Sequence, residues 1–75
     1  MKNDYTGLKE KFGSHIKKLR DDRKLPLREF ATRCELDYSQ ISKIENGKTN
    51  IQLSTIFELA KGLDVEPRDL LDFKF

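Results

Sequence analysis

The sequence predicts a small all-α domain of five short helices. Its 75 residues are 36% hydrophobic and 37% charged, which suits one small core in a well-solvated domain. Hydrophobic side chains recur at intervals of three and four residues in several separate stretches, as on one face of a helix. Glycine, proline and asparagine fall between these stretches, where helices tend to end. Together these features indicate a single helical domain over residues 1–75.

The first helix is expected to follow a polar N-terminal segment, residues 1–7, which we expect to be flexible. Asp4 or Thr6 is available to cap this helix. Hydrophobic residues then recur at spacings of four, four and three, with lysine and arginine at many of the positions between them. The stripe consists of Leu8, Phe12, Ile16 and Leu19, and we assign the last three to the core.

Two helices in close succession follow, within residues 27–46. Pro26 disfavours a helical conformation at Leu25 and fits the first turn of the next helix, so Leu25 becomes a core residue at the junction. Two apolar stripes lie on either side of a polar break at residues 35–37, which leaves a connection of about three or four residues. The stripes contain Phe30, Ala31, Cys34 and Leu36, then Ile41 and Ile44. Helices joined so tightly must cross steeply, and the small Ala31 lets them approach.

The Asn46-Gly47 pair ends the second of these helices, since glycine adopts a left-handed conformation freely. A fourth helix is expected to end near Asp64, because its apolar residues recur at spacings of three, one, three and three. These residues are assigned to the core: Leu53, Ile56, Phe57, Ala60 and Leu63.

A short fifth helix is expected from Pro67, since proline suits the first turn of a helix, and Asp69 then lies near the positive end of the helix dipole. Hydrophobic residues continue to the end of the chain, where a small monomer has little interior left to offer. Loose, exposed chain ends are one interpretation. We favour the alternative, an apolar patch within residues 70–75 that a second copy of the chain covers. The patch would consist of Leu70, Leu71, Phe73 and Phe75.

The charges are distributed unevenly. The formal net charge is only +2, but residues 1–48 carry 12 Lys and Arg against 8 Asp and Glu, and residues 49–75 carry 3 against 5. The two parts are therefore +4 and −2, which permits one basic side and a less basic far side. The single cysteine, Cys34, excludes an internal disulfide and lies on an apolar stripe, where a buried and unreactive thiol is expected.

The sequence predicts a protein that is not an enzyme. The only histidine, His15, has no partner motif and is expected to be exposed. There is no Gly-rich phosphate loop, metal-ligand spacing or nucleophile motif, so no metal, cofactor or small-molecule ligand is expected. The sequence also lacks a signal peptide and any run of about 18 apolar residues. We therefore expect a soluble, cytoplasmic protein without a membrane partner.

The strongest functional feature is the outward face of the second of the two helices within residues 27–46. Positions opposite Ile41 and Ile44 must point away from the core if these isoleucines are buried. Most are neutral hydrogen-bonding residues, with one cation, which suits a surface that reads base edges. They are Tyr38, Ser39, Gln40, Ser42 and Lys43. Asp37 or Ser39 could cap the helix. A merely solvated face has a similar composition, so the residues alone leave both interpretations open.

The pair of helices resembles the helix-turn-helix of the lambdoid phage repressor and Cro family, and the similarity continues through residues 44–48, Ile-Glu-Asn-Gly-Lys. It extends from about Phe12 to Leu71. The resemblance implies a compact, lambda-repressor-like DNA-binding domain with its motif at residues 27–46. Two positions depart from the family pattern. Glu35 stands where the turn usually has glycine, which implies a left-handed residue at a cost on the order of 1 kcal/mol. Leu27 stands where glutamine is usual, which removes a familiar DNA contact.

The resemblance also implies roles for individual residues. Arg20 would pair with Glu45 and tie the first helix to the recognition helix, a structural role that we favour over direct phosphate contact. Bases would be read in the major groove by Tyr38, Ser39, Ser42 and Lys43. The DNA backbone would be held by Gln40, Gly47, Lys48, Thr49 and Asn50. An ordinary solvated turn at residues 48–50 is the alternative.

These features predict a sequence-specific regulator of transcription that binds double-stranded DNA and acts by occupancy, as a repressor or autoregulator. A homodimer on a palindromic site is expected, because one recognition helix reads too few base pairs for regulatory specificity. The resemblance covers phage repressors, controller proteins of restriction-modification systems and autoregulatory antitoxins. A protein-interaction module, with a partner such as a toxin, is therefore the second interpretation.

Overall fold

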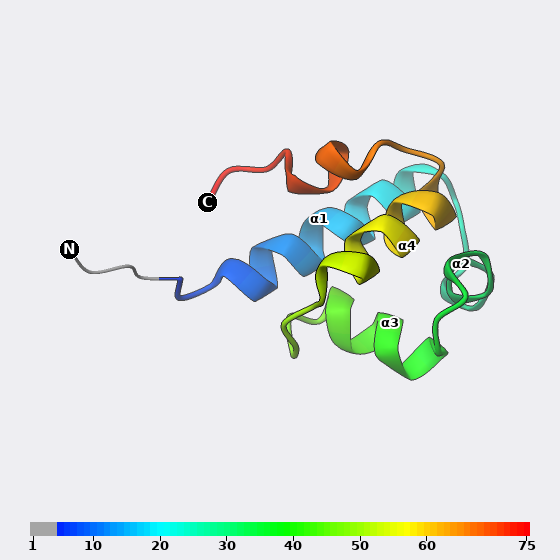
Figure 1. Ribbon diagram of the computed structural model, residues 1–75, viewed down its shortest axis with the longest axis horizontal. Coiled ribbons are helices and arrows are strands. Elements are labelled where there is room, and N and C mark those ends of the chain that lie inside the picture. The colour runs from blue at the N-terminus through cyan, green and yellow to red at the C-terminus, as the bar shows by residue number, and fades with distance from the viewer. Residues whose placement is uncertain (1–4) are drawn as a thin grey trace.

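The computed structural model describes residues 5–75 as four α-helices followed by one 3₁₀ helix (Figure 1). The helices are α1, Leu8–Asp22; α2, Leu27–Cys34; α3, Tyr38–Glu45; α4, Leu53–Leu63; and η1, Pro67–Leu71. The predicted all-α class is confirmed, but the count of five α-helices is wrong. The last segment has only five residues and forms a 3₁₀ turn, with the Asp69 N–H donating to the carbonyl oxygen of Glu66 at 2.9 Å.

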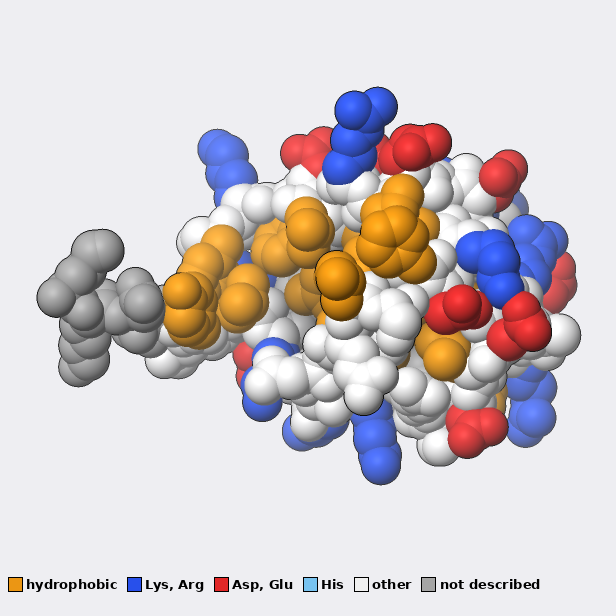
Figure 2. Space-filling model, viewed as in Figure 1, with side chains coloured by type: hydrophobic (Ala, Val, Ile, Leu, Met, Phe, Trp, Pro, Cys, Tyr) orange, Lys and Arg blue, Asp and Glu red, His pale blue; other side chains and the backbone are white. Residues whose placement is uncertain are grey.

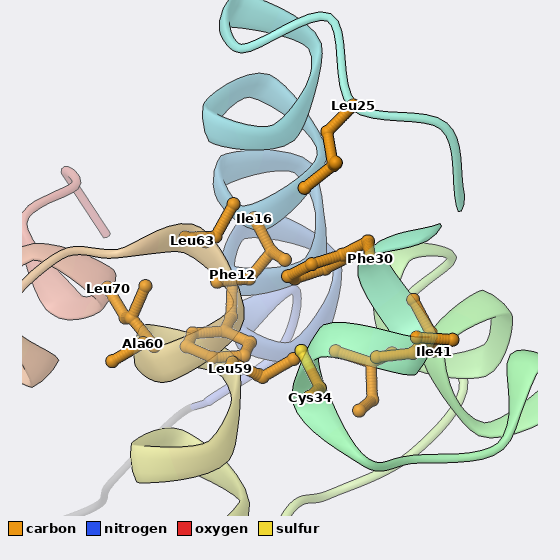
Figure 3. Packing of buried hydrophobic residues seen from close by; sticks show 12 residues of the cluster. Phe12, Ile16, Leu25, Phe30, Cys34, Ile41, Leu59, Ala60, Leu63 and Leu70 are labelled. Atoms are coloured by element: carbon orange, nitrogen blue, oxygen red, sulfur yellow. The ribbon is translucent and has the colours of Figure 1, made fainter. Parts of the chain in front are cut away.

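The core lies where the helices meet, and Phe30 of α2 points from its helix toward α1 and α4 (Figure 3). Its buried members are Phe12, Ile16, Leu25, Phe30, Ala31, Cys34, Ile41, Ile44, Leu59, Ala60, Leu63 and Leu70. Leu19 and Ile56, both predicted inside, are partly buried at its edge. Most of the predicted core is therefore confirmed.

Two core assignments on α4 are wrong. Leu53 is 73% exposed and Phe57 is 56% exposed. The face of α4 that meets the core is instead centred on Leu59 and Leu63, which are fully buried. The helix carries two adjacent apolar stripes, and spacing alone does not tell which of them faces the interior.

Leu70 and His15 are also placed differently from the prediction. Leu70 is fully buried in the core of the single chain, so it is not available to a second copy. His15 is half-buried, and its Nε2 lies at hydrogen-bonding distance, 2.8 Å, from the carbonyl oxygen of Asp69. Its ring centroid lies 5.4 Å from that of Phe73. Both corrections have one cause: η1 and the segment after it fold back onto α1.

A glycine lets α1 and α3 pack with their backbones in contact. Gly13 is buried in α1, and a Cβ atom at this position would meet the carbonyl oxygen of Ile44 and lie 2.7 Å from that of Glu45. An ordinary carbon–oxygen contact is about 3.3 Å or longer. Only glycine therefore fits here, even though glycine inside a helix usually costs about 0.5–1 kcal/mol relative to alanine.

The N-cap residues of α1 and α3 make no side-chain capping hydrogen bond. The N-cap residue of α1 is Gly7 rather than Thr6, and Asp4 lies outside the described residues. Asp37 occupies the N-cap position of α3, but neither its side chain nor that of Ser39 makes a capping hydrogen bond. Packing against the core therefore supplies most of the stability of both helices.

Candidate nucleic-acid interface

The connection between α2 and α3 depends on a left-handed residue. Glu35 has φ 58° and ψ 38°, as predicted for the turn. Its N–H donates to the Thr32 carbonyl at 3.2 Å and the N–H of Leu36 donates to the Ala31 carbonyl at 3.0 Å, which closes the C-terminal end of α2. The Glu35 side chain forms an ion pair with Lys61 of α4, and the hydrogen bond from Lys61 lowers the pKa of the Glu35 carboxyl. The turn is therefore anchored to a third helix.

α3 lies along one edge of the molecule, with its N-terminal end beside α2 (Figure 1). Ile41 and Ile44 hold it to the core and are 0% and 2% exposed. Its other side is open to solvent: Tyr38, Ser39, Gln40 and Lys43 are exposed, and Ser42 is half-buried. The predicted outward face is thus present, with Ser42 at its inner edge.

An ion pair fixes the C-terminal end of α3 against α1. Arg20 donates from Nε to Oε2 of Glu45 at 2.6 Å and from Nη2 to Oε1 at 3.0 Å. Its Nη1 donates to the carbonyl oxygen of Leu25 at 2.8 Å. The side chains of Arg20 and Glu45 are only 11% and 5% exposed, and the hydrogen bond to Glu45 raises the pKa of the Arg20 guanidinium. The predicted pair exists, and it restricts rotation of α3 about its axis.

The first two backbone N–H groups of the loop after α3 donate to carbonyl oxygens of α3 itself. Gly47 is left-handed at φ 69°, as predicted, and its N–H donates to the Ile44 carbonyl at 3.1 Å. The N–H of Lys48 donates to the Lys43 carbonyl at 2.9 Å. Gly47 is buried, so it shapes the loop, and its expected role as a phosphate donor is not supported. The side chains of Lys48 and Asn50 remain exposed beside α3.

A polar hollow of about 460 Å³ joins the outer face of α3 to this loop. Ser39, Gln40 and Lys43 line it from α3, and Thr49 and Asn50 line it from the loop. Candidate base-reading and backbone-binding residues therefore border the same concavity, which would accept part of an extended polar partner. Lys48 does not line this hollow.

Sequence reasoning did not single out several residues that the structure places at this surface. Gln52 and Thr55 complete the wall of the hollow where α4 begins. Arg28 of α2 lies with its guanidinium carbon 5.0 Å from the centroid of the Tyr38 ring. Gln52 is a polar residue two positions after the predicted loop, residues 48–50, so it could have been included in the predicted site. Arg28 gave no such signal, because its partner is ten residues away in the neighbouring helix.

Other kinds of site have no support in the part of the chain that the structure describes. Within residues 5–75, no group of three or more histidine, cysteine or acidic side chains is arranged to hold a metal ion. No helix in that range is long and apolar enough to cross a bilayer. The Cys34 side chain is buried, and burial raises the pKa of its thiol to about 12, so it is a packing residue.

Comparison with known proteins identifies relatives of the chain. The helix-turn-helix family matches residues 16–70. Control protein C.BamHI from Bacillus amyloliquefaciens is 36% identical over 63 residues, which cover 83% of this chain and 78% of that protein. The HTH-type transcriptional repressor RghR from Bacillus subtilis strain 168 is also 36% identical over 63 residues, covering 83% of this chain and 47% of RghR.

A solved structure agrees with the same assignment. The restriction-modification controller protein C.AhdI from Aeromonas hydrophila superposes with a TM-score of 0.79 at 38% identity, over 81% of this chain and 92% of that chain. The family match runs from α1 into η1 and includes α2, the turn, α3 and the loop that borders the polar hollow. The resemblance drawn from the sequence is confirmed: the chain belongs to the helix-turn-helix family.

Proposed function

We propose that this DNA-binding transcriptional regulator acts in the cytoplasm by occupancy, as a homodimer on a palindromic double-stranded site where it represses transcription or controls its own gene. The observation that carries the proposal is the exposed polar face of α3, which is supported from behind by two buried isoleucines and by the Arg20–Glu45 pair. A rigid helix with a hydrogen-bonding outer face is what major-groove readout requires.

Sequence would be read by Tyr38, Ser39, Ser42 and Lys43. The N-terminal part of the second motif helix enters the major groove in this type of docking. Lys43 can donate to O6 and N7 of guanine, and the serine hydroxyls can donate or accept. Tyr38 can present its ring to a thymine methyl group. Ser42, being half-buried, would contribute only after close approach of the DNA.

The DNA backbone would be held beside this face by Gln40, Lys48, Thr49 and Asn50. Three of them line the polar hollow, and Lys48 is the exposed cation next to it. Phosphate contacts of this kind fix the register of a protein on DNA without reading its sequence. The Thr49 hydroxyl donates to the Asn50 carbonyl at 3.0 Å, so it would have to exchange that bond for a phosphate oxygen and is the weaker candidate.

A second copy would cover the apolar surface formed by α4 and the C-terminal segment, where hydrophobic side chains gather on one face (Figure 2). Of the residues predicted for this contact, Leu71 and Phe75 are 57% and 56% exposed, whereas Phe73 is half-buried. Leu53 and Phe57 extend the exposed apolar surface along α4. Exposed apolar patches of this kind mark interaction sites, and two-fold pairing would present two recognition helices about 34 Å apart.

The relatives support regulation by occupancy. One is named a control protein, one a transcriptional repressor, and the solved relative is a controller protein of a restriction-modification system. A protein-interaction module is the second candidate function, because the same exposed apolar surface could receive a different protein.

Selection of bound sequences from random double-stranded DNA tests the proposal. The wild-type chain should recover a palindromic motif with half-sites about one helical turn apart. Lys43→Ala should lose about 1–3 kcal/mol on that site and relax the preference at one base position. Arg68→Ala is a control, because Arg68 is an exposed cation in η1, outside α3, the loop that follows it and the predicted contact at residues 70–75.

Sedimentation of the free protein, with and without Phe57→Glu, tests the dimer. The wild type should sediment as a dimer and the variant as a monomer with lower affinity for the full site, because a charge in an apolar contact is costly to bury.

In the selection experiment, identical motifs for wild type and Lys43→Ala would show that Lys43 does not read sequence. Recovery of no motif, together with tight binding to another protein, would favour the interaction module.

A further inference from the structure

Arg28 and Tyr38 form a contact between the two helices of the motif. Arg28 is the second residue of α2, Tyr38 is the first residue of α3, and the guanidinium carbon lies 5.0 Å from the centroid of the tyrosine ring. This distance is within the range of a cation–π contact. Tyr38 remains 47% exposed, so one part of its ring carries the guanidinium while another part is open to solvent.

The charge of Arg28 is not neutralised by a carboxylate in the described part of the chain. None of the ion pairs between residues 5 and 75 includes Arg28, and the adjacent Glu29 pairs with Arg33 at 2.9 Å. A cation–π contact leaves the positive charge in place, and the guanidinium has five N–H donors, more than one contact with a ring can occupy. Arg28 is therefore positioned and still able to donate to an anion.

The place of the contact indicates which anion. Tyr38 is at the end of α3 that enters the major groove in helix-turn-helix docking, whereas the first motif helix crosses the DNA backbone. Arg28 belongs to that first helix and reaches the ring of a residue on the second. In that docking its guanidinium would lie at the border between the groove and a DNA strand, where the anionic groups of the partner are phosphates.

We propose that Arg28 is an additional DNA-binding residue, which donates to a backbone phosphate while the Tyr38 ring holds its guanidinium, and which in turn restricts the position of that ring against the base it reads. The inference rests on the proposed DNA-binding function and adds a contact from α2 to it. Phosphate oxygens match the planar fork of an arginine better than the point charge of a lysine.

The affinity for DNA as a function of salt concentration tests the phosphate contact. Binding is measured on a selected site and on a scrambled duplex for the wild type, Arg28→Ala and Arg28→Lys. Arg28→Ala should weaken binding to both duplexes and reduce the slope of log K against log salt by about one for each bound subunit. The loss of affinity should be larger on the selected site, where the Tyr38 ring also loses its support. Arg68→Ala is the matched control, since Arg68 of η1 is also exposed and is in no ion pair within residues 5–75. Its slope should not change.

A double-mutant cycle tests the positioning by Tyr38. The effects of Arg28→Ala and Tyr38→Leu should be coupled by about two- to fivefold in affinity, the size of an exposed cation–π contact. In the Tyr38→Phe background the effect of Arg28→Ala should persist in full, because phenylalanine keeps the ring face. Arg28→Lys should preserve most of the salt slope and have a weaker coupling to Tyr38, because arginine is the commoner cation in such contacts. Thermal unfolding of each variant establishes that the domain is folded.

An unchanged salt slope in Arg28→Ala would overturn the phosphate contact, and so would a loss of affinity confined to one base sequence. Additive effects of Arg28→Ala and Tyr38→Leu would overturn the role of the ring. A different result would contradict the proposed function, namely a wild-type chain that selects no DNA sequence. Because the salt slope is also measured on the scrambled duplex, Arg28 is tested in either case.

Discussion

Gly13→Ala is the substitution for which the structure and helix propensity predict opposite signs. Propensity alone predicts stabilisation by about 0.5–1 kcal/mol, because alanine is the better helix former. In the structure, the added methyl group would meet the Ile44 carbonyl oxygen and lie 2.7 Å from that of Glu45, both in the backbone of α3. Backbone cannot rotate away as a side chain can, so α1 and α3 would have to separate.

Overpacking of a close contact costs about 1–3 kcal/mol, and the gain in helix propensity offsets about 0.5–1 kcal/mol of it, so we expect a net loss of about 1–2 kcal/mol. A change of 1 kcal/mol shifts the Tm of a 60–100-residue domain by about 4–8 °C. We therefore expect Gly13→Ala to lower the Tm by about 5–15 °C, with some loss of DNA affinity because α3 and the Arg20–Glu45 pair are displaced.

Thermal unfolding followed by circular dichroism measures this effect, with Ser14→Ala as the control. Ser14 is the exposed neighbour of Gly13 in α1, so alanine there should slightly raise the Tm. A Tm of Gly13→Ala equal to or above that of the wild type would refute the close approach of the two helices.

Three further predictions concern the site and the core. Lys48→Ala should weaken specific and nonspecific DNA binding about equally and reduce the salt slope by about one for each bound subunit, and a loss on a single sequence would instead make Lys48 a base reader. Glu45→Ala should cost about 3–5 kcal/mol in chemical denaturation, because it leaves Arg20 charged and only 11% exposed; a loss below 1 kcal/mol would contradict this. Burial raises the pKa of the Cys34 thiol from its ordinary value of 9.0 to about 12. Because the folded pKa is the higher, the stabilisation is complete below about pH 9 and declines toward pH 12 by about 1.4 kcal/mol per pH unit. Denaturation between about pH 8 and 10 should show a steeper decline for the wild type than for Cys34→Ala, and parallel curves would contradict the burial effect.

The helices, the turn and the outward face of α3 could be predicted from the sequence because each depends on residues close together in the chain. Ile41 and Ile44 lie three residues apart, so burial of both determines which side of α3 faces solvent. The burial of Cys34 follows from its place on an apolar stripe. The left-handed conformation of Glu35 was implied by the family resemblance, because Glu35 stands where the turn usually has glycine. The Arg20–Glu45 pair required the family resemblance, because no local pattern connects residues 25 apart.

Only the tertiary structure decided which apolar residues were inside and which surfaces met. Two apolar stripes on α4 are equivalent by spacing, and the packing of α2 and η1 buries Leu59 while it leaves Phe57 in solvent. The return of η1 to α1 buries Leu70 and gives His15 a partner 54 residues away. The need for Gly13 and the contact of Arg28 with Tyr38 likewise arise from the approach of neighbouring helices. The spacing of apolar residues shows which sides of one helix are apolar. These features depend instead on distances between helices, which a single stretch of sequence does not specify.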